Sequence, residues 1–356
     1  MKKIVLTGGG TAGHVTPNLA LIPKLRELGY EIHYIGSYDG IEKRLVESYD
    51  IPYYGISTGK LRRYFDIKNF TDPFRVIKGF GEAKKHLKEI QPDIIFSKGG
   101  YVSVPVVRAA ASMKIPCIIH ESDMTPGLAN KLCIPVATKV CCNFPETLST
   151  LPAEKAVLSG SPIRAELKSG SRETGMQLCG FHENKPVVMV IGGSLGALHV
   201  NTAVREALPE LLKDFYVVHV CGKGKMDESL KDLSDYRQFE YVTDDLKHLF
   251  AMADVVISRA GANAICELLS LRKPNLLIPL GLQASRGDQI LNARSFEAQG
   301  YSMLLIEEDI KDDVLPNMVR ELYCNRQQYI DAMSQGTIAD PIMTITNLIE
   351  EYCKHE

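Results

Sequence analysis

A glycine-rich turn near the start of the chain is the first segment whose residues could do chemistry. Residues 6–17 read LTGGGTAGHVTP, and Gly8, Gly10 and Gly13 fit the Gly-x-Gly-x-x-Gly spacing with which backbone N–H groups hold a dinucleotide pyrophosphate. His14 follows directly, and an imidazole with an ordinary pKa of about 6.5 suits proton removal at neutral pH. The stretch predicts hydride chemistry or another use of a phosphate-holding turn, with His14 as a general base, a phosphate ligand or a helix cap.

A nicotinamide dinucleotide site also needs an acidic residue about 20 positions after the glycines, where it holds the ribose hydroxyls. The expected second strand, residues 31–37, ends in Ile35-Gly36-Ser37, and the nearest acidic residue is Asp39. The missing acid weakens the dehydrogenase interpretation without deciding it.

Two more turns place small residues between an apolar run and a helical pattern. They read FSKGGYVSVP at 96–105 and SRAGANAICE at 258–267. Backbone N–H groups at such a helix start make an anion site, so Ala262, Asn263 and Ala264 could hold a diphosphate, with Glu267 one turn later on a ribose. That arrangement suits a sugar-nucleotide donor; the alternative is that these glycines only make tight turns.

The elements that must position these turns follow from a regular alternation. Short apolar runs, such as Lys3–Thr7 and 31–36, alternate with helical patterns, which predicts parallel sheets covered by helices on both faces. The pattern pauses in a Gly- and Ser-rich stretch at 159–175 and then restarts with a strand, a glycine turn and a helix start.

We therefore predict an α/β protein with two doubly wound, Rossmann-like domains that face each other across a cleft. The first domain is residues 1–162, and the second is residues 163–340. A last helix in 341–356 is expected to pack back on the first domain. Ligands of such sheets bind at the carboxyl ends of the strands.

Composition narrows the class of protein. The chain has 356 residues, with 43 acidic against 41 basic side chains, which gives no argument for wholesale nucleic-acid binding. The nine cysteines include no Cys-x-x-Cys pair and indicate reduced packing residues. No signal peptide and no run of about 18 apolar residues is present, which predicts a cytosolic protein.

One basic segment departs from this neutral balance. Lys60–Lys88 holds nine Lys or Arg against three Asp or Glu, interleaved with aromatic side chains at Tyr64, Phe65, Phe70, Phe74 and Phe80. Such a composition suits the anionic, cytoplasmic side of the cell membrane, to which we expect peripheral binding. The alternative is that Phe70, Phe74, Ile77 and Phe80 form the buried stripe of one helix. No RNA-binding motif accompanies the segment, so no nucleic-acid partner is expected.

Seven motifs in order resemble one family over nearly the whole chain. They are GGGTAGHVTPNLAL, SKGGYVSVPVVRAA, IIHESDMTPGLANK, GSPIRAEL, GGSLGA, SRAGANAICE and SRGDQILNA. Together they resemble the MurG family of peptidoglycan glycosyltransferases. The resemblance implies a GT-B fold, UDP-N-acetylglucosamine (UDP-GlcNAc) as donor and inversion at the anomeric carbon. It also implies a β-1,4 link to the muramic acid of lipid I, the undecaprenyl-linked muramyl-pentapeptide, which gives lipid II. By the same resemblance, residues 1–162 would bind the acceptor and the membrane, and residues 163–340 would bind the donor.

The resemblance also implies site residues at the positions where the motifs match. Val242 would meet the uracil, Glu267 the ribose, and Ala262, Asn263 and Ala264 the phosphates. Further donor contacts are implied at Arg164, Ser194, Asp288 and Gln289, with Thr11, Ala12 and Gly13 from the other domain. Many members read His-Glu-Gln-Asn where this chain reads His120-Glu121-Ser122-Asp123, which puts a carboxylate at Asp123 in place of the amide expected near the sugar.

The chemistry asks for a base, a stabilised sugar cation and neutralisation of the leaving diphosphate. The sequence has no Asp-x-Asp metal-binding pair. Backbone N–H groups, a helix dipole and Arg164 would substitute, so we predict metal-independent transfer without a cofactor. The base candidates are His14 and Glu121, and Glu121 could instead brace its loop.

Three other functions share parts of this pattern. One is a GT-B enzyme that glycosylates diacylglycerol, against which GGYVSVP and HESD-x-TPGLANK argue. The others are a non-hydrolysing UDP-GlcNAc epimerase and a sugar-nucleotide sensor without catalysis. A dehydrogenase is the function that the sequence favours least.

Overall fold

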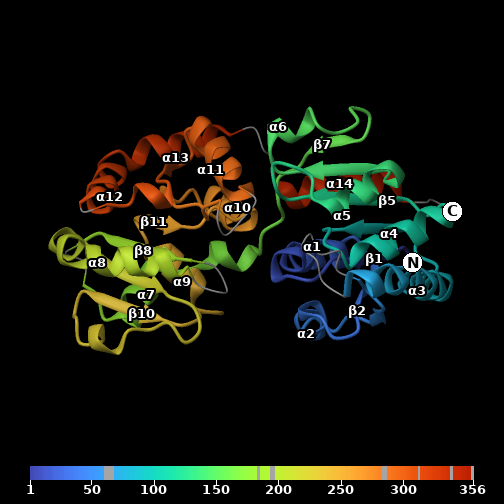
Figure 1. Cartoon of the computed structure of the whole chain (residues 1–356), viewed down its shortest axis with the longest axis horizontal. Coiled ribbons are helices and arrows are strands. Elements are labelled where there is room, and N and C mark those ends of the chain that lie inside the picture. Colours follow the sequence, from blue (N-terminus) through green and yellow to red (C-terminus); the bar gives the residue numbers. More distant parts are fainter. Residues whose placement is uncertain are drawn as a thin grey trace. The chain divides into compact units, whose positions relative to one another are not determined.

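The computed structural model describes residues 1–59, 68–182, 185–192, 197–282, 287–311, 313–336 and 340–353, and only the backbone of residues 68–71. The chain forms two compact units (Figure 1). Unit 1 is Met1–Arg164 with Ile338–Glu356, and unit 2 is Ala165–Thr337.

Unit 1 is built on a seven-stranded parallel sheet in the order β3-β2-β1-β4-β5-β6-β7. The strands are β1 (Lys3–Thr7), β2 (Glu31–Ser37), β3 (Tyr53–Ile56), β4 (Ile94–Ser97), β5 (Cys117–Glu121), β6 (Lys139–Cys142) and β7 (Ala156–Leu158). The strand order reverses between β1 and β4, and such a reversal is where doubly wound sheets bind ligands. The turns after β1 and β4 therefore lie at the predicted binding edge.

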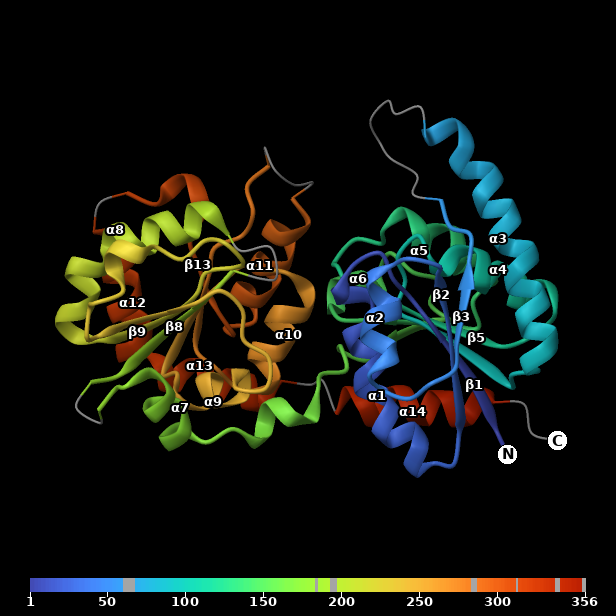
Figure 2. The ribbon, with the colours of Figure 1, turned by 90° about the horizontal axis from the view of Figure 1, so that it is seen from below.

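Side chains of the unit 1 strands alternate between two apolar cores. Ile4, Phe96 and Ile118 pack in one core with helices α1 (Thr16–Glu27) and α14 (Pro341–Tyr352). Val5 and Ile95 point to the other core, under α3 (Lys68–Ile90) and α4 (Ser103–Ser112). Figure 2 shows these two helix pairs on opposite sides of the sheet. The remaining helical elements of unit 1 are η1 (Ala12–His14), α2 (Ile41–Glu47), α5 (Leu128–Cys133), η2 (Ile134–Val136) and α6 (Pro145–Leu148).

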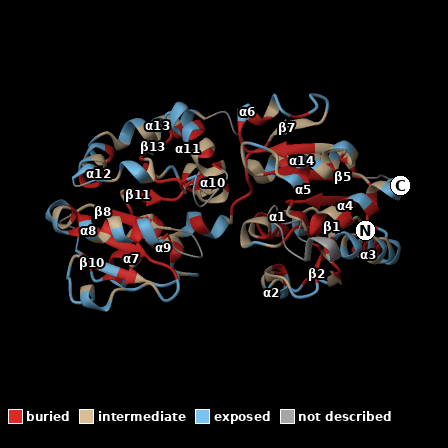
Figure 3. Cartoon of the chain, viewed as in Figure 1, coloured by how far each residue is buried: buried red, intermediate tan, exposed pale blue. Residues whose placement is uncertain are grey.

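Unit 2 repeats this architecture with a six-stranded parallel sheet in the order β10-β9-β8-β11-β12-β13. The strands are β8 (Val187–Ile191), β9 (Tyr216–Val220), β10 (Tyr236–Phe239), β11 (Val255–Ser258), β12 (Asn275–Leu277) and β13 (Met303–Leu304). Its order reverses between β8 and β11. In Figure 3 the strands of both units are buried, whereas the outer faces of the helices are exposed.

The helices of unit 2 cover both faces of its sheet. They are η3 (Ala165–Ser169), α7 (Arg172–Cys179), α8 (Leu198–Asp214), η4 (Glu228–Leu230), α9 (Leu246–Met252), α10 (Ala262–Ser270), α11 (Asp288–Ala298), η5 (Glu307–Asp309), α12 (Val314–Cys324) and α13 (Arg326–Gln335). Val200 of α8 and Val319 of α12 pack in one core with Val188 and Ile257 of the sheet. The two-sheet, Rossmann-like fold predicted from the alternation is confirmed.

Three details of the prediction differ from the structure. The run FEYVT at 239–243 predicts a strand, but β10 ends at Phe239, because Tyr236 is the buried side chain there while Tyr241 is exposed. The alternation does not predict strands β6 and β7, since both are short and α6, the helix between them, has only four residues. The Gly- and Ser-rich stretch 159–175, whose composition predicts an interdomain linker, contains η3 and the start of α7.

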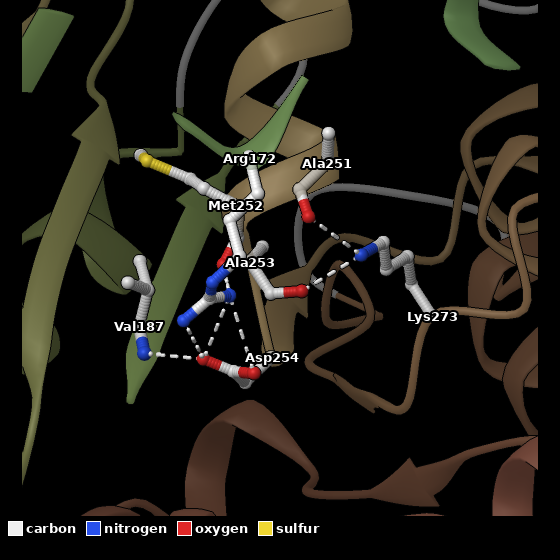
Figure 4. A network of polar contacts seen from close by, with 7 residues as sticks. All are labelled: Arg172, Val187, Ala251, Met252, Ala253, Asp254 and Lys273. Atoms are coloured by element: carbon white, nitrogen blue, oxygen red, sulfur yellow. Dashed lines mark hydrogen bonds and ion pairs between the residues drawn. The ribbon is translucent and has the colours of Figure 1, made fainter. Parts of the chain in front are cut away.

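A polar network fastens helix α7 to the amino-terminal edge of the unit 2 sheet (Figure 4). Arg172 Nη1 donates to the Met252 carbonyl at 2.6 Å and pairs with Asp254 at 3.4 Å. Asp254 Oδ2 also accepts from the Val187 N–H at 2.8 Å, and Lys273 Nζ donates to the Ala253 carbonyl at 2.8 Å. These residues lie at strand starts, away from the ligand-binding edge, so the network is structural.

The Lys273 side chain should make the stability of the folded protein depend on pH. Burial lowers the pKa of Lys273 to about 8 from an ordinary 10.5, although Asp254 opposes the shift. Between these values the unfolded chain holds the proton and the folded chain does not, so the contribution of Lys273 to stability rises with pH. We expect the free energy of unfolding of the native protein, relative to a Lys273→Met variant, to increase from pH 8 to 10.5. Unfolding free energies are measured by urea titration at each pH. A difference between the two proteins that does not change with pH would contradict this expectation.

Candidate functional site

The two glycine turns of unit 1 touch each other where the strand order reverses. Gly8 to Gly10 follow β1, and Gly99 and Gly100 follow β4. A Cβ atom added to Gly100 would lie 2.3 Å from the Gly9 carbonyl oxygen and 3.2 Å from His14 Nδ1. Gly100 also has a φ of +80°, so both its conformation and its surroundings require glycine. The turn after β4 therefore packs directly against the imidazole of His14.

His14 ends the short helix η1 and is half-buried. Its Nδ1 lies 2.9 Å from Thr11 Oγ1, and the backbone N–H of His14 donates to the Thr11 carbonyl at 3.1 Å. Burial and, to a smaller extent, the Lys98 ammonium together lower the pKa of His14 to about 4, although the Glu42 carboxylate opposes this shift. The imidazole is therefore neutral at physiological pH and can accept a proton. Thr11 is exposed beside it, and Ala12 and Gly13 form the same helical turn.

A buried lysine behind the turn after β4 was not identified from the sequence. Lys98 is fully buried, and its ammonium donates to His120 Nδ1 at 2.8 Å and to Ser122 Oγ at 2.6 Å. The other nitrogen of His120, Nε2, lies 2.8 Å from the Gly160 carbonyl oxygen. Burial and the neighbouring Lys98 hold the pKa of His120 well below its ordinary value, so this ring is neutral. The only sequence signal was the position of Lys98, directly after an apolar strand.

Glu121 ends β5, and its carboxylate is engaged with its own loop. Oε1 accepts from the Asp123 N–H at 3.0 Å, while Oε2 accepts from the Gly127 N–H at 3.0 Å and from Asn130 Nδ2 at 2.8 Å. Burial raises the pKa of Glu121, although these hydrogen bonds oppose the shift. Both oxygens thus brace residues 122–127, which is the second role considered for this residue. Asp123 is half-buried in the same loop.

The diphosphate candidates of unit 2 come together at one helix start. Gly261 caps α10, and Ala262, Asn263 and Ala264 are its first three residues, beside the reversal between β8 and β11. The N–H groups of a first helical turn have no partners within the helix and carry its positive dipole end. Glu267 is half-buried in the next turn of the same helix. The arrangement suits an anion with a hydroxyl-bearing group beyond it.

An ion pair that sequence reasoning missed stiffens this turn. Arg259, just before Gly261, is buried and donates to the carbonyls of Ile278 at 3.1 Å and Pro279 at 3.0 Å. Its Nη2 lies 2.8 Å from Glu307 Oε1. Burial alone would raise the pKa of Glu307, but its pairing with Arg259 holds that pKa below the ordinary range. The turn before α10 is thereby tied to the chain beyond β12 and β13.

The other predicted donor contacts lie on several different elements. Gln289 lies in the first turn of α11, next to Asp288, and its Oε1 accepts from the Leu280 N–H at 3.0 Å, which leaves its NH₂ group to donate. Asn292 of the same helix donates to the Ala260 carbonyl at 3.3 Å and so ties α11 to the turn before α10. Val242 is half-buried after β10, and Arg164 ends the main segment of unit 1, whereas Ser194 lies outside the described residues.

Neither a metal-binding cluster nor a membrane-spanning helix occurs in the described ranges. No group of three or more His, Cys, Asp or Glu side chains placed by the structure could hold a metal ion. Among the helices with described residues, none is both long and apolar enough to cross a bilayer.

Comparisons with known proteins agree over the full length. The chain matches the glycosyltransferase family 28 N-terminal domain over residues 4–142 and the family 28 C-terminal domain over residues 187–345. A Lachnospira eligens protein is 64% identical over 99% of this chain and 100% of its own. It is named UDP-N-acetylglucosamine--N-acetylmuramyl-(pentapeptide) pyrophosphoryl-undecaprenol N-acetylglucosamine transferase.

Two solved structures share the fold. The Acinetobacter baumannii MurG crystal structure is 25% identical, with a TM-score of 0.77 over 99% of this chain and 100% of that one. A Listeria monocytogenes structure described as a UDP-N-acetylglucosamine 2-epimerase is 14% identical, with a TM-score of 0.69 over 99% of this chain and 97% of that one. The second likeness concerns the fold alone.

Proposed function

The chain belongs to the MurG family within glycosyltransferase family 28, and from that membership we propose its reaction. It transfers N-acetylglucosamine from UDP-GlcNAc to the C4 hydroxyl of undecaprenyl-pyrophosphoryl-MurNAc-pentapeptide, which converts lipid I to lipid II in peptidoglycan synthesis. The observation that carries the proposal is the full-length identity of 64% to a transferase of that name. The placement of the family's motif residues at the binding edges of both sheets supports it.

Unit 2 is proposed to hold the donor. The first turn of α10, Ala262 to Ala264, would receive the diphosphate on its N–H groups, and the Glu267 carboxylate would accept from the ribose hydroxyls. Gln289 would donate its NH₂ group to a sugar hydroxyl, because its oxygen already accepts from Leu280. Further proposed contacts are Val242, Arg164, Ser194, Asp288, Asp123, Thr11, Ala12 and Gly13.

Unit 1 is proposed to supply the base. His14 Nε2 or Nδ1 would take the proton of the acceptor C4 hydroxyl as that oxygen bonds to the anomeric carbon and UDP leaves from the opposite face. The N–H groups and dipole of α10 would stabilise the charge that develops on the departing diphosphate. Glu121 is the weaker base candidate because both of its oxygens brace residues 122–127.

The rival with the same fold is a UDP-GlcNAc epimerase, which turns over donor alone. Release of UDP from UDP-GlcNAc by purified protein, with and without a lipid I analogue, separates the two. We expect UDP to be released only when the acceptor is present. Because the proposed diphosphate site uses no metal, we expect this release to persist in EDTA. Isomerised sugar formed without acceptor would favour the epimerase. Release that stops in EDTA and returns with magnesium would retain the transferase and overturn the metal-independent site.

Peripheral binding to the cytoplasmic side of the cell membrane is proposed through α3. Phe74 and Ile77 are 74% and 68% exposed, so the alternative of a single buried stripe is wrong for these two residues. The buried face of α3 instead carries Ala83, Leu87 and Ile90. Residues 60–67 of the predicted membrane segment, including Tyr64 and Phe65, lie outside the described residues, as does the side chain of Phe70.

A double change of Phe74→Ser and Ile77→Ser tests this surface. Arg75 and Lys78 are exposed beside the two apolar side chains, so apolar insertion and attraction to anionic lipid should act together. We expect binding to phosphatidylglycerol vesicles to fall about tenfold, a loss of about 1.4 kcal/mol. The matched control is Leu233→Ser, a 38% exposed leucine of unit 2. Equal binding by the double variant and the native protein in a sedimentation assay would rule the surface out.

A further inference from the structure

Unit 1 also contains a fully buried carboxylate, that of Glu42 in the first turn of α2. Its Oε2 accepts from the Gly10 N–H at 3.1 Å. Its Oε1 accepts from the Ser37 N–H at 3.0 Å and from the Ser37 hydroxyl. One side chain thus joins the turn after β1 to the end of β2, at the carboxyl edge of the sheet.

Three glycines make the space for this carboxylate. A Cβ atom on Gly9 would lie 2.5 Å from Glu42 Cδ, and one on Gly36 would lie 2.9 Å from Glu42 Cγ. On Gly40 a Cβ atom would lie 2.1 Å from Glu42 Oε1. Any side chain at these positions would displace the carboxylate. The glycine turn therefore directs the Gly10 N–H at an internal anion, where a dinucleotide site would offer it to a pyrophosphate.

The anchored turn continues directly into the base candidate. Gly10 has a φ of +86°, and the next residue, Thr11, contacts His14 through both its hydroxyl and its carbonyl. The Glu42 charge also acts on His14, where it opposes the lowering of the pKa by burial and by Lys98. Glu42 is thus linked to His14 through two residues of backbone and through its charge.

We propose that Glu42 is a positioning residue for the transfer reaction, which fixes the turn of Gly10 and Thr11 so that His14 meets the acceptor hydroxyl. The inference rests on the proposed function and deepens it. A carboxylate is needed because it is an acceptor at both oxygens, whereas Gln presents an NH₂ group to one of the two backbone donors. Replacing one acceptor leaves a buried N–H without a partner and lets the turn shift.

The test compares Glu42→Gln with the native chain in steady-state transfer to a lipid I analogue. We expect kcat to fall about tenfold while KM for UDP-GlcNAc rises by no more than about threefold, because most of the proposed donor contacts lie in unit 2 and only those at Thr11, Ala12 and Gly13 move with the turn. In a His14→Ala background, Glu42→Gln should cause no further loss, since the two residues act as one unit. A Glu42→Gln variant that retains the native kcat would overturn the proposal. The same fractional loss of kcat from Glu42→Gln in the native and the His14→Ala backgrounds would also overturn it.

Ser37→Ala provides a second variant if Glu42→Gln does not fold. It removes one hydrogen bond to Oε1 and leaves the charge in place, so we expect a two- to threefold loss of kcat that disappears in the His14→Ala background. A loss in melting temperature without a change in kcat would assign Glu42 to stability alone and overturn its positioning role. A native protein that transfers no sugar would defeat the proposed function, whereas an active native protein with unaffected variants would defeat only this inference.

Discussion

His14→Ala is expected to lower kcat for transfer by about 10²- to 10⁴-fold, the range that a positioned general base contributes. The imidazole is half-buried, neutral and held by Thr11 at the edge of the unit 1 sheet where the strand order reverses, the edge at which doubly wound sheets bind ligands. KM for UDP-GlcNAc should stay within about threefold, because the proposed donor contacts of unit 2 are untouched. His14→Gln is the matched control, since it keeps a polar side chain of similar size without the basic nitrogen.

Retention of kcat within about threefold in both variants would remove His14 as the base. A rise in KM for the donor with kcat unchanged would instead support the alternative that His14 is a phosphate ligand.

The pH dependence of the rate separates the two roles further. Because the pKa of His14 is lowered to about 4, its base form is already populated at pH 5. On the acidic side of the pH profile, we therefore expect kcat/KM to stay constant from pH 8 to 5 and to fall only as the pH approaches 4. A half-maximal rate at about pH 6.5 would indicate an unperturbed histidine.

Glu267→Ala is expected to lower kcat/KM for UDP-GlcNAc by about 100-fold. A carboxylate that accepts from ribose hydroxyls makes charge-assisted hydrogen bonds, each of about 1.5–3 kcal/mol. Glu267 lies on α10 one turn beyond the proposed diphosphate site, so the nucleotide would lose its second anchor. The loss should appear mainly in KM, and Kd for free UDP by calorimetry should rise in parallel.

Glu267→Gln is the matched control and should retain part of the affinity, because its amide oxygen still accepts. As a second control, Glu173→Ala removes a carboxylate from α7, whose Arg172 belongs to the network at the opposite edge of the sheet, and should leave Kd for UDP unchanged. Unchanged affinity for UDP in both Glu267 variants would show that the ribose is held elsewhere.

Sequence patterns predicted the parts of this molecule that depend on local spacing. Alternating apolar runs located most strands, and the small residues after β1 and β11 located the turns at the edges where each strand order reverses. Partners distant along the chain gave no such signal. Glu42 meets Gly10 across 32 positions and Arg259 meets Glu307 across 48, and only the packing of α2 and η5 onto the sheets brings each pair together.

Helical spacing also could not decide which face of α3 is buried. The segment repeats apolar residues at three- and four-residue intervals, so Phe74 and Ile77 fit a buried stripe as well as Ala83 and Leu87 do. The structure buries only the second pair. Ala83 and Leu87 share a helical face with the buried Asp72 and Gly79, whereas Phe74 and Ile77 lie on the opposite face. The burial of Lys98 was unpredictable for a related reason: a lysine after a strand is ordinarily solvated, and its acceptors on β5 and its loop are 22 and 24 positions away.

The most direct test of the central claim follows the sugar itself. Purified protein is incubated with UDP-GlcNAc labelled in the sugar and with a lipid I analogue, and the lipid fraction is analysed by mass spectrometry. We predict one added N-acetylhexosamine, β-linked to the C4 oxygen of the muramic acid, in an amount equal to the UDP released. Label that stays in the nucleotide fraction, or that appears as an isomerised sugar with the lipid unchanged, would contradict the transferase.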